Sequence, residues 1–528
     1  MQRAGLLIFA CLLTASYQKS TPADDSYVAA VVEYEVNSNV TTNIQNYVNL
    51  IKEAADQNAD IIVFPEMTLT RGQRRVLIPF HGILKQFPVP ATRPDLYDEI
   101  LVSISQAALD HQIYVVINVQ ELMDCNDASE EYCPEPKEYL FNTNVVFDRT
   151  GSVIDRYRKI NLFGEFTRTP ALKPDLGVFS TDFGVTFGHF ICFDLMFQVP
   201  AVQVVEKHNL TDIVFTTMWF SELPYLTAVQ IQQAYAYAKN VNFLAAGANN
   251  VRAGSAGSGI YSGEAGTLVS VMPGVPTTRL LVSKVPKTPG KVKEPYPGPI
   301  SDDPKSMDNL VLISDPSLPS HVSRPLVQGS QEFVLTTKEV SCKFRVKLRF
   351  RNGEQGAHFR AMVKDGINTY SRRDLGVAAC LVTACRNDTA ESCPYRFNKG
   401  EENVEIEELA IEMTTYRLHY NTSLQCDDIV YFPISFRNNK FPLSAKNFTF
   451  TISPKMATGE SYNLKSRLGQ KEHLSYQLNA PQTDLVAFGV WGRIYNRDVD
   501  FNKPTTAEDL QNYLEIEDWI YKRDKKDN

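Results

Sequence analysis

The chain divides into two regions with different patterns of apolar and polar residues. Up to about residue 285, short continuous apolar runs alternate with segments whose apolar residues recur at helical spacing. Beyond residue 310, apolar and polar positions mostly alternate one by one and few helical signals occur, as in half-buried strands. The pattern predicts an α/β domain followed by a β-rich domain.

The first region supplies the elements of an α/β sheet. Strands are predicted at 27–36, 60–66, 113–119, 142–148, 152–159, 183–194, 212–219 and 241–250, and helices at 43–58, 96–111, 200–208 and 228–240. Continuously apolar strands joined by helices are typical of a sheet that is covered on both faces. Residues 285–304 are rich in Pro, Gly and Lys, which favours a linker or an extended surface wrap. In the second region, strands are predicted within 333–350, 447–453 and 485–495.

Composition and the N-terminus narrow the class of protein. The chain has 528 residues, of which 43% are hydrophobic, enough for two to four globular domains. An apolar run over about 4–13, followed by small residues at 14–16, predicts a cleaved signal peptide at 1–16. That run is much shorter than the roughly 20 residues needed to span a bilayer. The charged C-terminus predicts no lipid or membrane anchor, and a net charge of -8 without a basic stripe predicts no nucleic-acid partner.

Sequons and cysteines agree with export. Glycosylation is predicted at Asn39, Asn209, Asn387, Asn421 and Asn447. Eight of the nine cysteines remain after the signal peptide, and Cys125 and Cys133 are placed to close a polar loop. If Cys192 is unpaired, seven cysteines are left, so at least one more must be unpaired or bonded to another molecule. The count alone is equally compatible with a disulfide at Cys192.

Three ionisable residues stand where predicted strands end. Glu66 closes DIIVFPE, where partial burial would suit a general base. Lys159 lies in DRYRKINLFGE and could stabilise negative charge on a reacting carbonyl. Cys192 closes FGHFIC and could be a nucleophile, with Asp194 orienting the site or capping the next helix. Taken singly, each fits a structural role equally well: a strand-terminal glutamate, a solvated lysine and an inert buried thiol.

Other chemistries lack their motifs. His189 is three residues from Cys192 on the same predicted strand and would point to the other face, so a Cys-His pair is not expected. The chain contains no G-x-S-x-G elbow, no H-E-x-x-H, no P-loop and no G-x-G-x-x-G. No cysteine pair has zinc-ligand spacing beside suitable histidines. We therefore expect neither a metal nor a cofactor.

Together and in this order, FPE, YRKINLFGE and ICFD resemble the Glu-Lys-Cys motifs of the nitrilase superfamily, whose members hydrolyse non-peptide carbon-nitrogen bonds. CFDLMF, TTMWFSELPYLTAVQIQQAYAYAKNVNFLAAGANN, AGSGIY and the late GVWGRIY are similar to the vanin and biotinidase branch. The resemblance spans nearly the whole mature chain. It implies a four-layer αββα sandwich over 25–310 and a vanin-type β-rich domain over 311–515.

The resemblance also implies roles for individual residues. Cys192 would be the nucleophile, Glu66 the general base and Lys159 the stabiliser of the tetrahedral intermediate. Glu165 would support the site, and the backbone N–H of Phe193 would complete the oxyanion hole. Trp219 and Tyr261 are expected to border the substrate pocket, although both could equally be core aromatic residues.

The expected activity follows from that branch, whose members are secreted or lipid-anchored glycoproteins. We expect a secreted amidase that acts on a small vitamin-derived amide, with pantetheine as the leading substrate. Biocytin is the alternative, because the segment NLFGEFTRTP is closer in length to biotinidase than to vanins. A non-catalytic extracellular glycoprotein on the same fold is a third possibility, against which the intact Glu66, Lys159 and Cys192 argue.

Overall fold

The computed structural model describes residues 19–70, 74–124, 137–303, 305–351, 357–398, 403–416, 419–453 and 471–499. The predicted signal peptide at 1–16, the Cys125–Cys133 loop and the predicted domain end at 515 lie outside these residues.

Two sheets form the core of the first half of the chain. The first contains, in order, β14 (Arg279–Pro286), β1 (Ser26–Glu35), β2 (Ile61–Val63), β4 (Tyr114–Asp124), β5 (Glu138–Phe147) and β6 (Val153–Arg158), with β3 (Val76–Leu77) beside β4. The second contains β7 (Gly177–Ser180), β8 (Thr186–Ile191), β9 (Asp212–Thr217), β11 (Asn242–Asn249), β12 (Ser258–Ser262), β13 (Gly266–Val271) and β15 (Gly298–Pro299). The sheets meet where the end of β1 pairs with β11.

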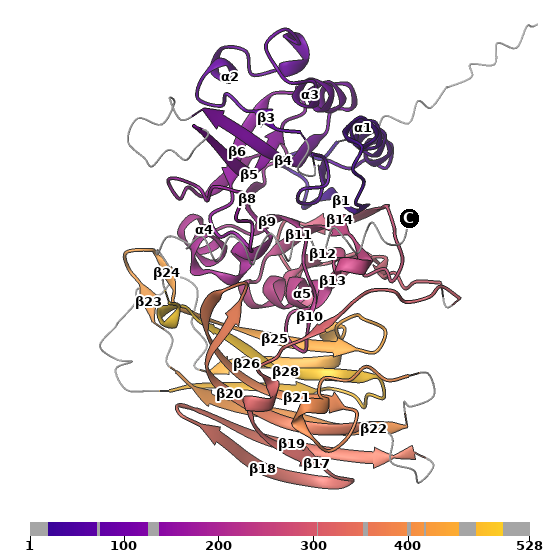
Figure 1. Ribbon diagram of the computed structural model, residues 1–528. Helices are drawn as coiled ribbons and strands as arrows, with labels where there is room; N and C mark the ends of the chain where they lie inside the picture. Colours follow the sequence, from indigo (N-terminus) through magenta and orange to yellow (C-terminus); the bar gives the residue numbers. More distant parts are fainter. Residues whose placement is uncertain are drawn as a thin grey trace, which may run out of the picture.

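Helices cover the outer face of each sheet. The helices are α1 (Val40–Asp56), α2 (Ile83–Gln86), α3 (Glu99–His111), α4 (Gln203–His208) and α5 (Ala228–Lys239). The apolar face of α1 packs on the first sheet with α3, and Tyr47 of α1 stacks on Phe64 just after β2. The inner faces of the two sheets share one apolar core, to which Val31 and Leu244 belong. Figure 1 shows these layers one below another, so the predicted four-layer αββα sandwich is confirmed.

The second half forms two antiparallel five-stranded sheets. One contains β17 (Val322–Leu326), β20 (His358–Tyr370), β21 (Arg373–Cys385), β28 (Leu485–Ile494) and β25 (Ile429–Arg437). The other contains β18 (Gly329–Thr337), β19 (Val340–Phe350), β22 (Val404–Thr415), β27 (Glu472–Leu478) and β26 (Phe448–Ser453). Two short pairs are β10 (Glu222–Leu223) with β16 (Ile313–Ser314) and β23 (Tyr420–Asn421) with β24 (Cys426–Asp427). A disulfide between Cys342 and Cys380 links β19 to β21, one strand of each large sheet.

The β-rich half packs directly on the helical layer of the first half. Helix α5 lies against β25, and the side-chain amide of Gln233 donates a hydrogen bond of 2.8 Å to the carbonyl of Leu443. The Pro-rich segment after β14 returns along the first half, where β15 pairs with β13. It is therefore a surface wrap, one of the two predicted forms, and the two halves share an extensive apolar contact.

Two predicted elements have different limits in the structure. The helix expected over 200–208 becomes regular only at Gln203, because Val199 is extended as residues before proline usually are. The strand expected over 212–219 ends at Thr217, which leaves Met218 and Trp219 in the loop that follows.

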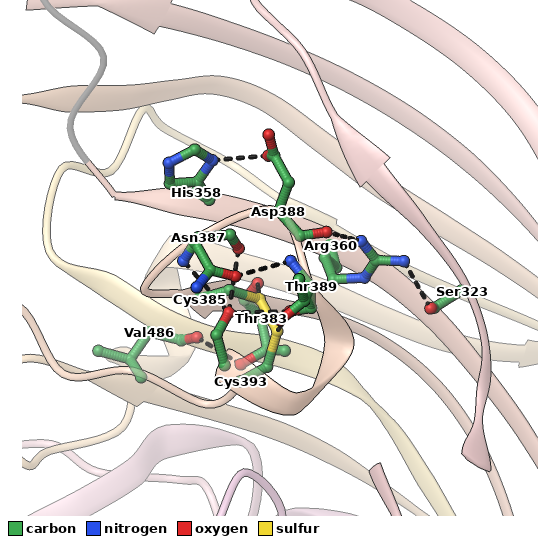
Figure 2. Close-up of a disulfide and its surroundings, with 11 residues drawn as sticks. Ser323, His358, Arg360, Thr383, Cys385, Asn387, Asp388, Thr389, Cys393 and Val486 are labelled. Atoms are coloured by element: carbon green, nitrogen blue, oxygen red, sulfur yellow. Dashed lines mark hydrogen bonds and ion pairs between the residues drawn. A yellow bond between two sulfur atoms is a disulfide. The ribbon is translucent and has the colours of Figure 1, made fainter. Parts of the chain in front are cut away.

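The cysteines and sequons can now be placed. Cys385 and Cys393 form a second disulfide, which closes the loop that carries the Asn387 sequon (Figure 2). Cys192 and Cys426 are both unpaired and buried, so the prediction of a second unpaired cysteine is confirmed. Three sequon asparagines are fully exposed and two are partly exposed, namely Asn39, Asn209 and Asn387, then Asn421 and Asn447. In the described part of the chain, no helix has the length and apolar character of a membrane span.

Candidate active site

Glu66 is presented by a tight turn after β2. The strand ends at Val63, and three residues later the Glu66 side chain is 3% exposed. The next residue, Met67, has a positive φ of 54°, and its backbone N–H donates a hydrogen bond of 2.8 Å to Oδ1 of Asn118 on β4. A non-glycine residue in this conformation needs such support from its surroundings. The turn therefore fixes the direction of the carboxylate.

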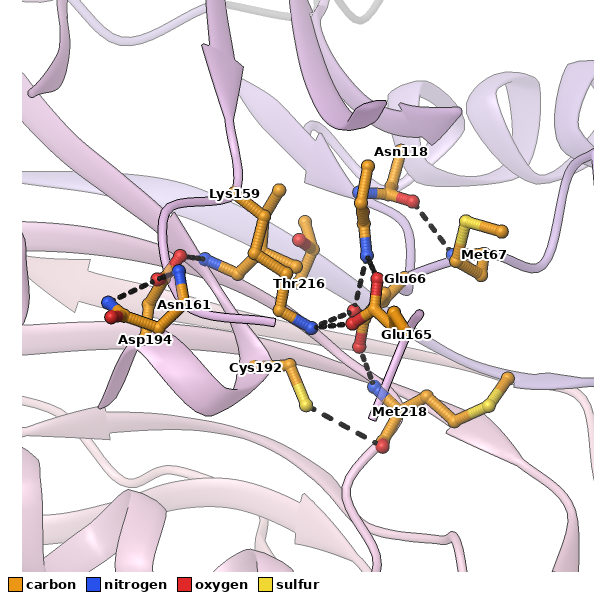
Figure 3. Close-up of polar contacts among 12 residues, drawn as sticks. Glu66, Met67, Asn118, Lys159, Asn161, Glu165, Cys192, Asp194, Thr216 and Met218 are labelled. Atoms are coloured by element: carbon orange, nitrogen blue, oxygen red, sulfur yellow. Dashed lines mark hydrogen bonds and ion pairs between the residues drawn. The ribbon is translucent and has the colours of Figure 1, made fainter. Parts of the chain in front are cut away.

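The Glu66 carboxylate accepts three hydrogen bonds. Oε1 accepts from Nζ of Lys159 at 2.7 Å and from Nδ2 of Asn142 at 2.7 Å. Oε2 accepts from the backbone N–H of Met218 at 2.7 Å, from the loop just after β9. Because the donors come from both sheets, the carboxylate lies where the ends of several strands meet (Figure 3).

Lys159 lies between two carboxylates. Its ammonium donates hydrogen bonds to Glu66 and to Oε1 of Glu165, and only 1% of its side chain is exposed. Asn142 bridges the same two acids, since its amide also donates to Oε2 of Glu165 at 3.0 Å. Burial alone would lower the pKa of Lys159, but the charges of Glu165 and Glu66 outweigh it and hold the pKa well above its usual value. Lys159 is therefore a fixed cation.

Cys192 occupies a sharp turn between β8 and the short 3₁₀ helix η3 (Cys192–Met196). Its φ is +50°, which is an unfavourable conformation for a residue with a side chain. The residue is 5% exposed, and its Sγ lies 3.6 Å from the carbonyl oxygen of Met218. Met218 thus contacts Glu66 through its N–H and Cys192 through its C=O, which brings acid and thiol to the same loop (Figure 3).

The thiol of Cys192 is protonated at neutral pH in this arrangement. Burial raises its pKa, the negative charge of Glu66 raises it further, and the positive charge of Lys159 only partly opposes them. A preformed thiolate would need a lowered pKa. The site can therefore generate a sulfur nucleophile only by transferring the thiol proton to a neighbouring base as the new bond forms.

Asp194 holds the cysteine turn against the segment that carries Lys159. Its Oδ1 accepts from the backbone N–H and the side-chain amide of Asn161 at 2.8 and 2.9 Å. Its Oδ2 accepts from the hydroxyl of Tyr157 at 2.7 Å and from the N–H of Ile191 at 3.2 Å. Burial raises the pKa of Asp194 to about 6, and these donors oppose the shift. Asp194 thus orients the site, as one of the two sequence interpretations proposed.

Comparison with known proteins agrees with this constellation. The family model for carbon-nitrogen hydrolases matches residues 28–271, and the model for the vanin C-terminal domain matches residues 311–498. Vanin-like protein 2 of Drosophila melanogaster is 32% identical over 532 residues, which cover 96% of each chain. The chain belongs to the vanin family of carbon-nitrogen hydrolases. This vanin-family chain is also 26% identical to the pantetheinase of Sus scrofa, over 92% of this chain and 95% of that one. To human biotinidase it is 32% identical over 52% of each chain.

Members of this family act on carbon-nitrogen bonds other than peptide bonds, and the vanin-family chain is accordingly an amidase. The predicted resemblance to the vanin and biotinidase branch is confirmed.

A small cavity of about 50 Å³ lies beside the thiol of the vanin-family chain. Its lining consists of Cys192 with Phe163, Phe193, Met196, Met218, Trp219, Phe220, Glu222, Leu226, Ile313 and Tyr370. Of the two predicted pocket aromatics, Trp219 lines the cavity and donates from Nε1 to the carbonyl of Leu226 at 2.8 Å. Tyr261 is fully buried in β12, is not among the described lining residues, and donates from its hydroxyl to Gln232 at 2.8 Å.

Several site residues were not predicted from the sequence. Asn142 and Asn118 lie on interior strands, where a polar residue in an apolar pattern was the available signal. Met218 contributes through its backbone, which leaves no signal in the residue type. His189, which was not expected to pair with the cysteine, bonds Asp155 instead at 2.8 Å.

The β-rich half also holds the cysteine turn. Arg493 of β28 is fully buried, and its Nε donates a hydrogen bond of 2.9 Å to the carbonyl of Met196, the last residue of η3. Its guanidinium also pairs with Asp498 at 2.7 Å. A buried cation from the second half thus satisfies a carbonyl of the helix that begins at Cys192.

Replacing Arg493 by methionine should lower the free energy of unfolding by about 3–5 kcal/mol, because Asp498 would lose its buried partner. Chemical denaturation of wild type and Arg493→Met would measure the difference. Arg349→Met is the control, since the Arg349 side chain is 58% exposed and its ion pair with Glu405 should contribute little. Equal losses for the two variants would contradict the assignment.

Proposed function

We propose that the chain hydrolyses pantetheine to pantothenate and cysteamine through a thioester on Cys192. The observation that carries the proposal is the buried array of Glu66, Lys159 and Glu165 directly beside a free, buried thiol. Similarity to a pantetheinase over 92% of the chain supports the substrate, because the match includes both halves of the molecule.

Acylation begins with proton transfer from sulfur. Glu66 accepts the thiol proton as Sγ of Cys192 attacks the amide carbonyl carbon, which is the step that the raised thiol pKa requires. The carbonyl oxygen becomes an oxyanion and accepts hydrogen bonds from Nζ of Lys159 and the N–H of Phe193. The first N–H groups of a helix lack intrahelical acceptors, so the amide of Phe193 at the start of η3 suits this role.

Collapse of the intermediate breaks the carbon-nitrogen bond. The leaving amine takes the proton held by Glu66, and the acyl group remains on sulfur as a thioester. Water then enters, Glu66 removes its proton, and attack on the thioester forms a second oxyanion at the same donors. Expulsion of the sulfur as thiolate, which recovers the proton from Glu66, releases the acid and restores the resting thiol.

The supporting residues have distinct tasks in this scheme. Lys159 stays charged throughout because its pKa is held high, so it stabilises the oxyanion and does not carry the proton. Glu165 and Asn142 hold Lys159 and Glu66 in place. No step calls for a metal or an organic cofactor.

We further propose that the chain is secreted as a glycoprotein with the small amide as its partner. The disulfides Cys342–Cys380 and Cys385–Cys393 suit an oxidising compartment. Exposure of Asn39, Asn209 and Asn387 makes those sequons accessible to the glycosylation machinery.

The substrate is tested by two assays on the purified chain, one for cysteamine released from pantetheine and one for lysine released from biocytin. We expect kcat/KM for pantetheine to exceed that for biocytin at least about tenfold, since pocket contacts commonly supply that much discrimination. Biotinidase activity is the second candidate, favoured by the 32% identity to human biotinidase. Faster cleavage of biocytin would establish that candidate and reject the pantetheine assignment.

A further inference from the structure

A second carboxylate faces the cavity beside Cys192 and has no part in the mechanism above. Glu222 lines this cavity, and it is the only charged residue among the described lining residues. Its side chain is partly buried, and within the described structure its carboxylate makes no hydrogen bond or ion pair. Carboxylates in such surroundings are normally paired. An unpaired one beside a reactive thiol points to a partner supplied by the substrate.

The backbone of Glu222 is held firmly. It lies on β10, which pairs with β16 from the start of the second half, and the N–H of Asp315 donates to the carbonyl of Leu223 at 2.8 Å. The N–H of Glu222 donates to the carbonyl of Leu226 at 3.1 Å, and Leu226 donates back at 2.8 Å. The carboxylate is therefore presented by fixed backbone on both sides.

The surroundings favour a positively charged partner. Burial raises the pKa of Glu222 to about 8, and the charge of Asp315 raises it further, so a cation in the cavity would relieve an unfavourable electrostatic field. The remaining lining is mostly aromatic, with Phe163, Trp219 and Tyr370 among its members. Aromatic faces combined with a carboxylate form a suitable site for an ammonium group.

The size of the cavity indicates which half of the substrate enters it. At about 50 Å³, it suits a small fragment such as a two-carbon amine and not a whole pantothenoyl group. The described lining contains no basic side chain that would neutralise Glu222.

We propose that Glu222 is a specificity-determining residue that binds an ammonium group on the amine half of the substrate. The inference rests on the proposed function, in which Cys192 attacks an amide at this cavity. It extends the substrate class from pantetheine to amides of short diamines, in which an ammonium group replaces the thiol of cysteamine. Asp315 and Tyr370 border the same position and place the second half of the chain in substrate selection.

The test compares two thiol reagents that differ in charge but hardly in shape, N-(2-aminoethyl)chloroacetamide and N-propylchloroacetamide. In each reaction the sulfur of Cys192 displaces chloride, a C–S bond forms, and the thiol proton is lost to base. Rates at Cys192 are followed by peptide mass mapping. In wild type, the cationic reagent should react about tenfold faster or more, as expected for one charge-assisted hydrogen bond. In Glu222→Gln the ratio should fall close to one.

Glu264→Gln is the matched control, because Glu264 is exposed on a separate turn and should leave the ratio unchanged. Equal rates of the two reagents in wild type, or a ratio that Glu222→Gln does not alter, would overturn the inference. The same comparison is then made for hydrolysis of pantetheine and N-(2-aminoethyl)pantothenamide. If Cys192 discriminates between the reagents but neither amide is cleaved, the proposed function fails and the assignment of Glu222 stands.

Discussion

Replacing Cys192 by alanine should abolish amide hydrolysis, with kcat falling by at least about 10⁴-fold, because no other group could form the covalent intermediate. The fold should be retained, since the thiol makes one weak polar contact, at 3.6 Å to Met218. Cysteamine release by wild type and variant measures the loss, and thermal unfolding checks that both are folded.

Cys426→Ala is the control for this experiment. Cys426 is the other unpaired buried thiol, and it lies on β24 in the second half, away from the described lining of the cavity. Its removal should leave kcat/KM within about twofold of wild type, as for surface or remote substitutions that leave the site intact. Undiminished activity in Cys192→Ala would exclude the thioester mechanism.

Replacing Lys159 by methionine should lower kcat by about 10³-fold or more. Loss of one oxyanion donor commonly reduces kcat by about 10²- to 10³-fold. Here the ammonium also separates Glu66 from Glu165, so its removal would leave two buried carboxylates without their common cation. One of them would then take up a proton, and Glu66 would be a poorer base. The loss should therefore exceed that of a single hydrogen bond.

Lys239→Met provides the matched control, because Lys239 is also a largely buried lysine and is paired with Glu206. It contacts neither the cavity nor the cysteine turn in the described structure. Both variants should lose stability, but only Lys159→Met should lose kcat. A Lys159→Met enzyme with nearly normal kcat would remove Lys159 from the mechanism.

Much of the catalytic half could be predicted because its chemistry falls at the ends of strands. Glu66 follows four apolar residues and a proline, and Cys192 follows an apolar strand, so period and order were sufficient to place both at a sheet edge. The resemblance then supplied their roles. That these residues lie close to one another depends on two separate sheets meeting, which local sequence does not specify.

The remaining features depend on contacts between distant parts of the chain. Arg493 reaches Met196 across 297 residues, and its position in an apolar strand gives no indication of a partner in the first half. Glu222 enters the cavity only because β16 pairs beside it and the loop after β9 begins earlier than its apolar pattern suggests. Asp194 had two interpretations, since the geometry of Asn161 and Tyr157 is a tertiary feature.

The β-rich half is thus part of the catalytic unit. It satisfies the carbonyl of Met196 through Arg493 and lines the cavity through Ile313 and Tyr370. Variation in this half is therefore expected to change substrate preference as well as stability.

The central claim is that catalysis passes through an acyl group on Cys192. Rapid acid quenching of the enzyme during pantetheine turnover, followed by peptide mass mapping, tests it directly. We predict a pantothenoyl adduct on the peptide that contains Cys192, labile to hydroxylamine as thioesters are and absent from Cys192→Ala. An adduct on another residue, or active enzyme whose Cys192 is engaged in a disulfide, would contradict the account.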